Sequence, residues 1–315
     1  MTTGAEPTPR SAVVRTVAIG VALPLLFVFF FVFPAHDPEP NGLPIGIAAP
    51  APVAERLASA LESREDGLDV RTFADAGALR AAIGDRAVYG GLVAPGGRPT
   101  RVLISSAQSA TVASLLGELG RAAGATRVEE VTPLAEDDPR GVTLNVLVLP
   151  VIITAILGAL LAVQLTPLLR TRQRLPLVAL TGLLAGLGTV GLVRLLDALR
   201  GPYLAEAGIV ALAIIAIALT AGGLIRVLGP PGVMVAFLLF LMLGSPASGL
   251  AGAPELLPTP WAQIGPLLPP GAVGSALRGT AYFDGARVLG PIVVLLAWAG
   301  VGIALNLVAD RRRAG

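Results

Sequence analysis

The sequence contains no cysteine and no lysine, and it has a single histidine, His36. Without cysteine the chain forms no disulfide, has no thiol nucleophile and builds no thiolate metal site. Without lysine it has no Schiff-base chemistry and no P-loop lysine. It also has no HExxH or GxSxG motif, and a lone histidine just after an apolar run is typical of a solvated loop residue. We therefore expect no enzyme, no bound cofactor and no metal site on this chain.

Charge is also scarce: 14% of the residues are charged, against about a quarter in a soluble domain, and 54% are hydrophobic. Segment 34–141 differs, with 15 acidic residues and 10 arginines, a net of −5. The remainder has 13 arginines and 6 acidic residues, a net of +7, which gives +2 overall. Arginine beside apolar runs suits membrane orientation and not nucleic-acid binding.

The long apolar runs predict an α-helical polytopic membrane protein with six transmembrane helices and an inserted extracytoplasmic α/β domain. About 18 or more apolar residues suffice to cross a bilayer. The predicted spans are 12–33, 142–168, 175–193, 207–225, 227–244 and 288–309. The first run ends in aromatic residues, which favours an uncleaved anchor over a signal peptide. The expected domains are a cytoplasmic tail (1–11), the first span (12–33), the α/β domain (34–141), a five-helix bundle (142–309) and a second cytoplasmic tail (310–315).

Arginine placement predicts the orientation. Nine arginines fall on the cytoplasmic side of this arrangement: Arg10, Arg15, Arg170, Arg172, Arg174, Arg226, Arg311, Arg312 and Arg313. Because positive residues accumulate on the inner side of membranes, we expect a multi-pass protein of the cell (plasma) membrane with both termini in the cytoplasm.

Alternating strand and helix patterns in 34–141 predict the α/β domain. Strands are expected at 43–48, 68–73, 88–93, 101–105 and 126–131, and helices at 52–63 and 109–122. Asp75 can cap a further helix that carries Leu79 and Ile83. A Pro-Gly-Gly turn at 95–97 separates the third strand from the fourth.

Segment 245–287 is apolar but interrupted by prolines and glycines, so it is not expected to span. Trp261 opens one helical pattern, and Pro269 with Pro270 ends that pattern and can start a second helix. Two short amphipathic helices that dip into the interface, an outer re-entrant hairpin, are the predicted structure.

Few polar residues lie in or beside the spans. Arg194, Asp197 and Arg200 cluster at the end of one span, where an interfacial ion pair is favoured over a proton relay. Gln164 and Asn306 lie within spans and suit hydrogen bonds between helices, or else a substrate path.

Two small-residue patterns predict close helix packing. Gly182 and Gly186 are four residues apart in one span, and Gly300 and Ala304 are four apart in the last span. Such pairs let another helix approach closely, although they arise often by chance in a chain with 38 glycines.

This layout resembles the ABC-2 type permeases of ABC transporters, in the branch with a large outer domain between the first and second spans (YhgE/Pip-like). The residues that carry the resemblance are AIGDRAVYG at 82–90 and LLPPGAVGSALR at 267–278, which ends at Arg278. The resemblance implies ATP-driven export with the ATPase on a separate chain, and the sequence has no GxxxxGK[ST] motif of its own.

The resemblance also implies partners and a contact. The partners are separate ABC ATPase subunits, which bind the ATP, and a second permease copy or paralogue, all within the lipid bilayer. The loop after the second span contacts the ATPase in this family, and here that loop carries Arg170, Arg172 and Arg174. Membrane orientation alone is the alternative role for these arginines.

We therefore expect the permease subunit of an ABC-2 type exporter, a transport subunit and not an enzyme. Spans with few polar groups favour an amphiphilic, drug-like or lipid-like cargo. The alternative is a non-transporting membrane receptor or cell-envelope scaffold whose outer domain binds a partner. An intramembrane enzyme is the third class, and no set of catalytic residues supports it.

Overall fold

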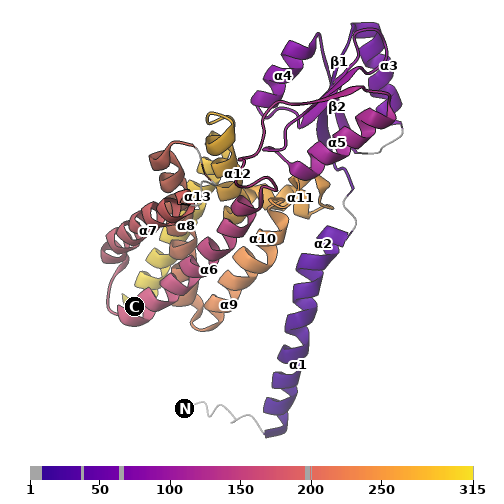
Figure 1. The fold of residues 1–315 in the computed structure, drawn as a ribbon. Helices are drawn as coiled ribbons and strands as arrows, with labels where there is room; N and C mark the ends of the chain where they lie inside the picture. Colours follow the sequence, from indigo (N-terminus) through magenta and orange to yellow (C-terminus); the bar gives the residue numbers. More distant parts are fainter. Residues whose placement is uncertain (1–8, 37–38, 64–66, 196–198, 200, 315) are drawn as a thin grey trace.

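The protein is described by a computed structural model that covers residues 9–36, 39–63, 67–195, 199 and 201–314. The predicted Asp197–Arg200 cluster and most of the N-terminal tail lie outside the described residues, as do the side chains of Arg10 and Arg15. The described chain forms a helical bundle, an α/β domain at one end of it and a long N-terminal helix beside it (Figure 1).

The α/β domain contains one five-stranded sheet. Its strands are β1 (Leu43–Ala48), β2 (Leu68–Phe73), β3 (Gly90–Val93), β4 (Arg101–Ile104) and β5 (Arg127–Glu130). They lie in the order β2-β1-β3-β4-β5, and all neighbours are parallel except β3 and β4. The connecting helices are α3 (Ala51–Glu62), α4 (Ala76–Gly84) and α5 (Ala110–Ala122). The strand–helix alternation predicted from sequence is therefore confirmed.

Local chemistry explains where these elements begin. The Asp75 carboxylate accepts a hydrogen bond from the Ala78 N–H at 2.8 Å and caps α4, as its sequence position predicts. Ser109 caps α5 in the same way through the Val112 N–H at 3.2 Å. The turn between β3 and β4 needs a left-handed residue, and Gly97 supplies it with φ +86°.

Four bundle helices are long and apolar enough to cross a membrane: α6 (Val142–Leu165), α7 (Thr171–Arg194), α8 (Tyr203–Leu228) and α13 (Leu289–Ala314). The other two predicted spans are helical, but their apolar stretches, Gly20–Val32 and Pro231–Ala247, are shorter. Each contains a π-helical segment. The first consists of α1 (Pro9–Phe27), η1 (Val28–Val32) and α2 (Phe33–His36), and the second of α9 (Pro231–Phe237), η2 (Leu238–Leu243) and α10 (Gly244–Ala247).

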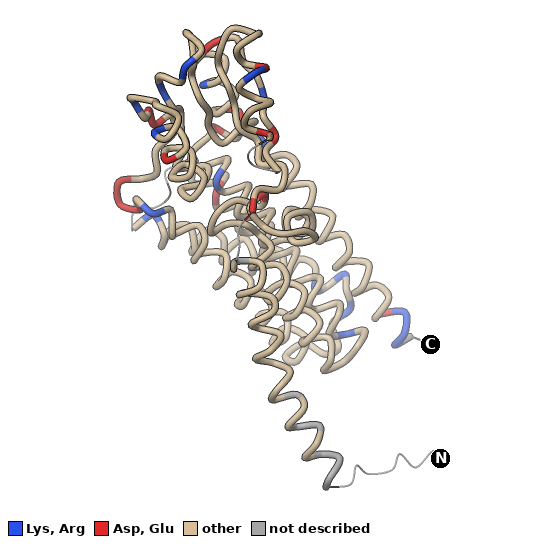
Figure 2. Tube along the Cα trace, turned by 90° about the vertical axis from the view of Figure 1, so that its right-hand side faces the viewer, with Lys and Arg blue, Asp and Glu red and all other residues tan. Residues whose placement is uncertain are grey.

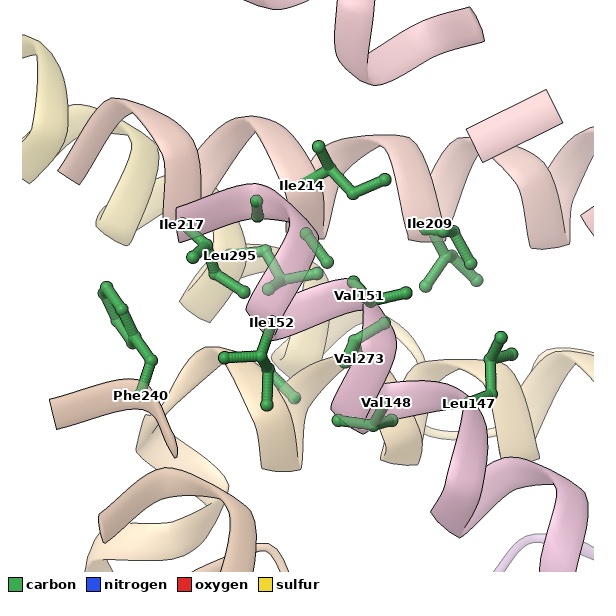
Figure 3. Packing of buried hydrophobic residues seen from close by; sticks show 14 of the residues in the cluster. Leu147, Val148, Val151, Ile152, Ile209, Ile214, Ile217, Phe240, Val273 and Leu295 are labelled. Atoms are coloured by element: carbon green, nitrogen blue, oxygen red, sulfur yellow. The ribbon is translucent and has the colours of Figure 1, made fainter. Parts of the chain in front are cut away.

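Helix α8 lies at the centre of the bundle, packed against α6, α7, α9, α12 and α13. Figure 3 shows the core around it, where Ile152 of α6, Ile217 of α8 and Leu295 of α13 come together. The outward faces are also apolar: Leu161 is 54% exposed and Leu184 is 60% exposed. A surface this apolar suits hydrocarbon and not water, so the described fold, a helical bundle with an α/β domain, is compatible with a membrane protein.

The segment between the fifth and last predicted spans folds at the end of the bundle that faces the α/β domain. Its elements are η3 (Pro254–Leu256), α11 (Trp261–Ile264), η4 (Gly265–Leu267) and α12 (Pro269–Tyr282). Helix α12 begins at Pro269, followed by Pro270 in its first turn. We keep the name outer hairpin for residues 245–287.

Candidate functional site

Figure 2 shows basic residues at the end of the bundle that carries the C-terminus, and mixed acidic and basic residues at the opposite end. We call the first the tail end, which includes the α6–α7 turn at 166–170 and Arg311–Arg313. We call the other the domain end, which includes the outer hairpin and the α/β domain. Both ends hold buried arginines, and their partners differ.

At the tail end, Arg226 joins three helices. Its fully buried guanidinium, on α8, forms an ion pair with Asp310 on α13. It also donates to Asn306 Oδ1 at 2.9 Å and to Thr171 Oγ1 at 3.3 Å. The Thr171 N–H, at the start of α7, donates to Asp310 Oδ2 at 2.8 Å. The charge of Arg226 is therefore neutralised, and the α6–α7 turn is tied to the last helix.

Arg174 is also buried at the tail end, and it caps α6. Its Nε donates to the Leu169 carbonyl and its Nη1 to the Ala162 carbonyl, each at 3.1 Å. Its Nη2 donates to the Thr166 carbonyl. Two of these carbonyls, Thr166 and Leu169, lie in the turn after α6, so this side chain holds the turn against the end of the helix.

Of the three arginines predicted to contact an ATPase, Arg170 and Arg172 are exposed and Arg174 is buried. The buried one holds the turn, and the side chains of the other two are exposed. The loop is short because α7 begins immediately after it, at Thr171.

The small-residue pairs have different surroundings. A methyl group at Gly182 would lie 2.5 Å from Ile215 Cγ1, and one at Gly186 would lie 2.6 Å from the Ala207 carbonyl oxygen, so this face packs on α8. Gly300 and Ala304 are exposed. A methyl group at Gly300 would meet nothing within 4 Å in the described chain.

Contact between α13 and α8 is made instead at Gly302 and Asn306. A methyl group at Gly302 would lie 2.5 Å from the Thr220 backbone nitrogen. Asn306 Nδ2 donates to the Leu219 carbonyl at 2.9 Å. Of the two roles considered for Asn306, the structure shows a hydrogen bond between helices.

At the domain end, Arg194 pairs with Glu206, a residue that sequence reasoning missed. The Glu206 side chain is completely buried, lies 3.1 Å from Arg194 and accepts from the Gly201 N–H at 2.9 Å. The Arg194 guanidinium also lies over the Tyr203 ring, 5.3 Å from its centroid. An acidic residue one turn after Pro202, at a helix start, was the available sequence signal.

Between the α/β domain and the outer hairpin lies a cavity of about 450 Å³, which we call the arginine cavity. Four arginines and one glutamate contribute to its wall: Arg71, Arg86, Arg278, Arg287 and Glu255. The two segments that carry the family resemblance, 82–90 and 267–278, both reach it.

Arg278, which is buried, and Arg86, which is partly buried, supply its inner positive charges. Arg278 Nη2 donates to the Leu250 carbonyl at 3.2 Å. Arg86 Nη1 donates to the carbonyls of Ser275 at 3.1 Å and Ala286 at 3.4 Å, and its Nη2 donates to Ser275 Oγ at 3.3 Å. Burial, reinforced by repulsion from Arg278, lowers the pKa of Arg86 to about 10. Among the residues that the structure describes, no carboxylate forms an ion pair with either arginine.

The single acidic side chain of the cavity wall is engaged elsewhere. The Tyr89 hydroxyl donates to Glu255 Oε2 at 2.7 Å. Burial, and then the charge of Glu255, raise the pKa of Tyr89 well above its usual value, so the hydroxyl keeps its proton. Glu255 forms no ion pair with Arg86 or Arg278 in the described chain, although its charge attracts both guanidinium groups.

A second cavity of about 350 Å³ adjoins the first, since Ser248 and Leu250 contribute to both walls. Its wall includes Phe31, Pro34 and Leu256, so it is largely apolar. We call it the apolar cavity. It extends from the outer hairpin to the N-terminal helix.

The remaining hairpin residues position this region. Trp261 is buried, and its ring lies 5.8 Å from the ring of Phe29 and 6.2 Å from that of Phe33. It thereby joins α11 to the N-terminal helix. Pro269 and Pro270 are buried in the first turn of α12, which places Arg278 two turns further along.

Comparison with protein-family models, with curated proteins and with solved structures gives no match. The class therefore rests on the fold: a mostly helical chain with four helices suited to span a membrane and an α/β domain.

Proposed function

We propose that this chain is the membrane permease subunit of an ATP-driven exporter of the ABC-2 type, with six spans, both termini in the cytoplasm and the ATPase on a separate chain. In this arrangement the tail end faces the cytoplasm and the α/β domain lies outside. The cargo is an amphiphilic, drug-like or lipid-like molecule, and a second permease copy or paralogue completes the pathway. The residue pattern of the outer hairpin and the overall layout support this proposal.

One observation carries the coupling step. Arg170 ends the α6–α7 turn and Arg172 lies in the first turn of α7, and both are exposed. Asp310 ties this region to the last helix, through the Thr171 N–H at 2.8 Å and through Arg226. A protein that binds these two arginines pushes on α7 and on α13 together. A contact of this kind suits the transfer of ATPase motion into a bundle.

The test is purification of the full chain from its native membranes, followed by identification of bound proteins. We expect a chain with a P-loop motif to be recovered in stoichiometric amount. Changing both exposed arginines (Arg170→Glu with Arg172→Glu) removes it, because charge reversal disrupts an ionic contact. The matched control is Arg121→Glu, an exposed arginine of the α/β domain, which leaves recovery unchanged.

Recovery of no P-loop protein contradicts export driven by ATP. If the α/β domain then binds a defined cell-envelope component, the receptor or scaffold alternative is supported instead. If an ATPase is recovered equally with wild type and the double variant, the arginine contact is wrong while the transporter class stands.

A further inference from the structure

We propose that the arginine cavity binds the oxyanion head group, phosphate or carboxylate, of an amphiphile whose tail lies in the apolar cavity. This inference concerns binding alone, and it does not depend on ATP-driven export.

The charge of the cavity wall is the first reason. Four arginines against one glutamate give +3, and Arg71 is neutralised by Asp69 outside the wall at 2.6 Å, which leaves +2. Arg287 is exposed to solvent, whereas Arg278 is only 8% exposed. Buried charges in proteins are normally paired. Glu255 is the single carboxylate in the wall for Arg86 and Arg278, so the cavity is short of one negative charge at these two arginines.

Unused hydrogen-bonding capacity is the second reason. Arg86 Nε is buried and has no partner among the described residues, as is also true of Arg194 Nε and Arg226 Nε, which lie outside this cavity. Gln108, which is 5% exposed and lies in the cavity wall, has a buried Oε1 that is likewise unpartnered in the described chain. This oxygen accepts hydrogen bonds, so it suits a donor elsewhere on the ligand, such as a protonated head-group oxygen, and not the oxyanion itself. An oxyanion accepts several N–H donors at once, and two guanidinium groups are the donors best suited to it.

Size and surroundings define the rest of the ligand. About 450 Å³ is within the range of small-molecule sites and exceeds what one phosphate fills. The adjoining apolar cavity begins at Ser248 and Leu250, next to the carbonyl that accepts from Arg278. A molecule with an anionic head and a hydrocarbon tail fits both cavities. Its head group supplies a negative charge to the arginines, and Phe31 and Leu256 cover its tail.

The test uses the full chain in micelles of dodecyl maltoside, a neutral detergent with a twelve-carbon tail. Dodecyl phosphate is added in increasing concentration. A chloride salt holds the ionic strength constant, so that the screening of charges by salt does not change during the titration. The melting temperature is followed by tryptophan fluorescence. We expect saturable stabilisation, because a ligand that binds only the folded state raises its stability.

Inorganic phosphate, titrated separately, distinguishes a free anion from an amphiphile. We expect it to stabilise the protein at a half-saturation concentration at least roughly tenfold higher than that of dodecyl phosphate, because it buries no tail. Equal half-saturation of the two probes overturns the assignment of an amphiphile.

Two variants test the site itself, Arg278→Gln and Arg86→Gln. Each removes a charged hydrogen-bond donor, so each should raise the half-saturation point for dodecyl phosphate roughly 10-fold to 100-fold. The control Arg56→Gln changes an exposed arginine on α3 and leaves the titration unchanged. Each variant is first shown to be monodisperse and folded without ligand. Unchanged titration of both folded cavity variants overturns the proposal.

Discussion

Each end of the bundle holds one arginine in an ion pair, Arg226 with Asp310 and Arg194 with Glu206, and other arginines that no carboxylate pairs in the described chain. At the tail end, Arg226 and Arg174 are neutralised by Asp310 or saturated with backbone carbonyls. At the domain end, Arg86 and Arg278 face a cavity and form no ion pair within the described chain. Burial alone therefore does not distinguish a structural arginine from one that awaits a ligand. The distinction lies in whether the fold supplies a carboxylate, as for Arg226, or an acceptor for every guanidinium nitrogen, as for Arg174.

The largest expected effect comes from removing a counter-charge at the tail end. Asp310→Ala leaves Arg226 buried and unpaired, so we expect the free energy of unfolding to fall by about 3–5 kcal/mol. The free energy of unfolding is measured by titrating the protein in mixed micelles with sodium dodecyl sulfate. The control Glu118→Ala removes an exposed acid on α5 and should be nearly neutral. Equal effects of the two substitutions contradict a structural role for the Arg226 pair.

The next effect concerns the cap on α6. Arg174→Ala leaves the Leu169 carbonyl without its guanidinium donor, whereas the Ala162 and Thr166 carbonyls keep the backbone N–H groups of Thr166 and Leu169. We expect a loss of about 1–3 kcal/mol in the free energy of unfolding, the cost of an unsatisfied acceptor. The same micelle titration measures it. A loss below the experimental error shows that water satisfies this carbonyl and that the side chain is free for a partner.

At the domain end the expected sign reverses. Arg278→Met replaces a buried unpaired charge by an apolar side chain of similar length, so stability in the absence of ligand should be unchanged or higher, by roughly 0–2 kcal/mol. Stabilisation by dodecyl phosphate is lost in the same variant. A destabilisation as large as that of Asp310→Ala contradicts this difference between the arginines, because it shows that Arg278 stabilises the fold as Arg226 does.

The smallest effect is expected at the exposed arginine of the tail end. Arg172→Ala should change the free energy of unfolding by less than about 0.5 kcal/mol, because its side chain is in solvent. Thermal unfolding and recovery of a bound P-loop protein are measured on the same preparation. A clear loss of stability in the isolated chain removes the reason to treat Arg170 and Arg172 separately from Arg174.

Much of the fold was predictable because it depends on local patterns. Strands β1 and β2 begin and end at the residues expected from their apolar runs, and α4 begins after the cap expected at Asp75. Long apolar runs became α6, α7, α8 and α13. The start of α12 at Pro269 followed from the restricted backbone of proline. Each of these features is determined by neighbours within about a turn.

The candidate sites were harder to predict because their residues are distant in sequence. Arg86 and Ser275 are 189 positions apart, and Tyr89 and Glu255 are 166 apart, so no spacing rule connects them. The three arginines of the α6–α7 turn look equivalent in sequence. Arg174 is buried whereas Arg170 and Arg172 are exposed, and this difference depends on the direction in which α7 extends from the turn.

The sequence by itself determined that this chain needs an apolar environment, where an α/β domain interrupts it and which residues start its helices, because those properties follow from composition and local backbone preference. Only the tertiary structure decided which arginines are neutralised and which face a cavity. The physical reason is that the energy of a buried charge depends on the groups within a few ångströms of it, and here those groups come from helices and strands that meet only when the chain is folded.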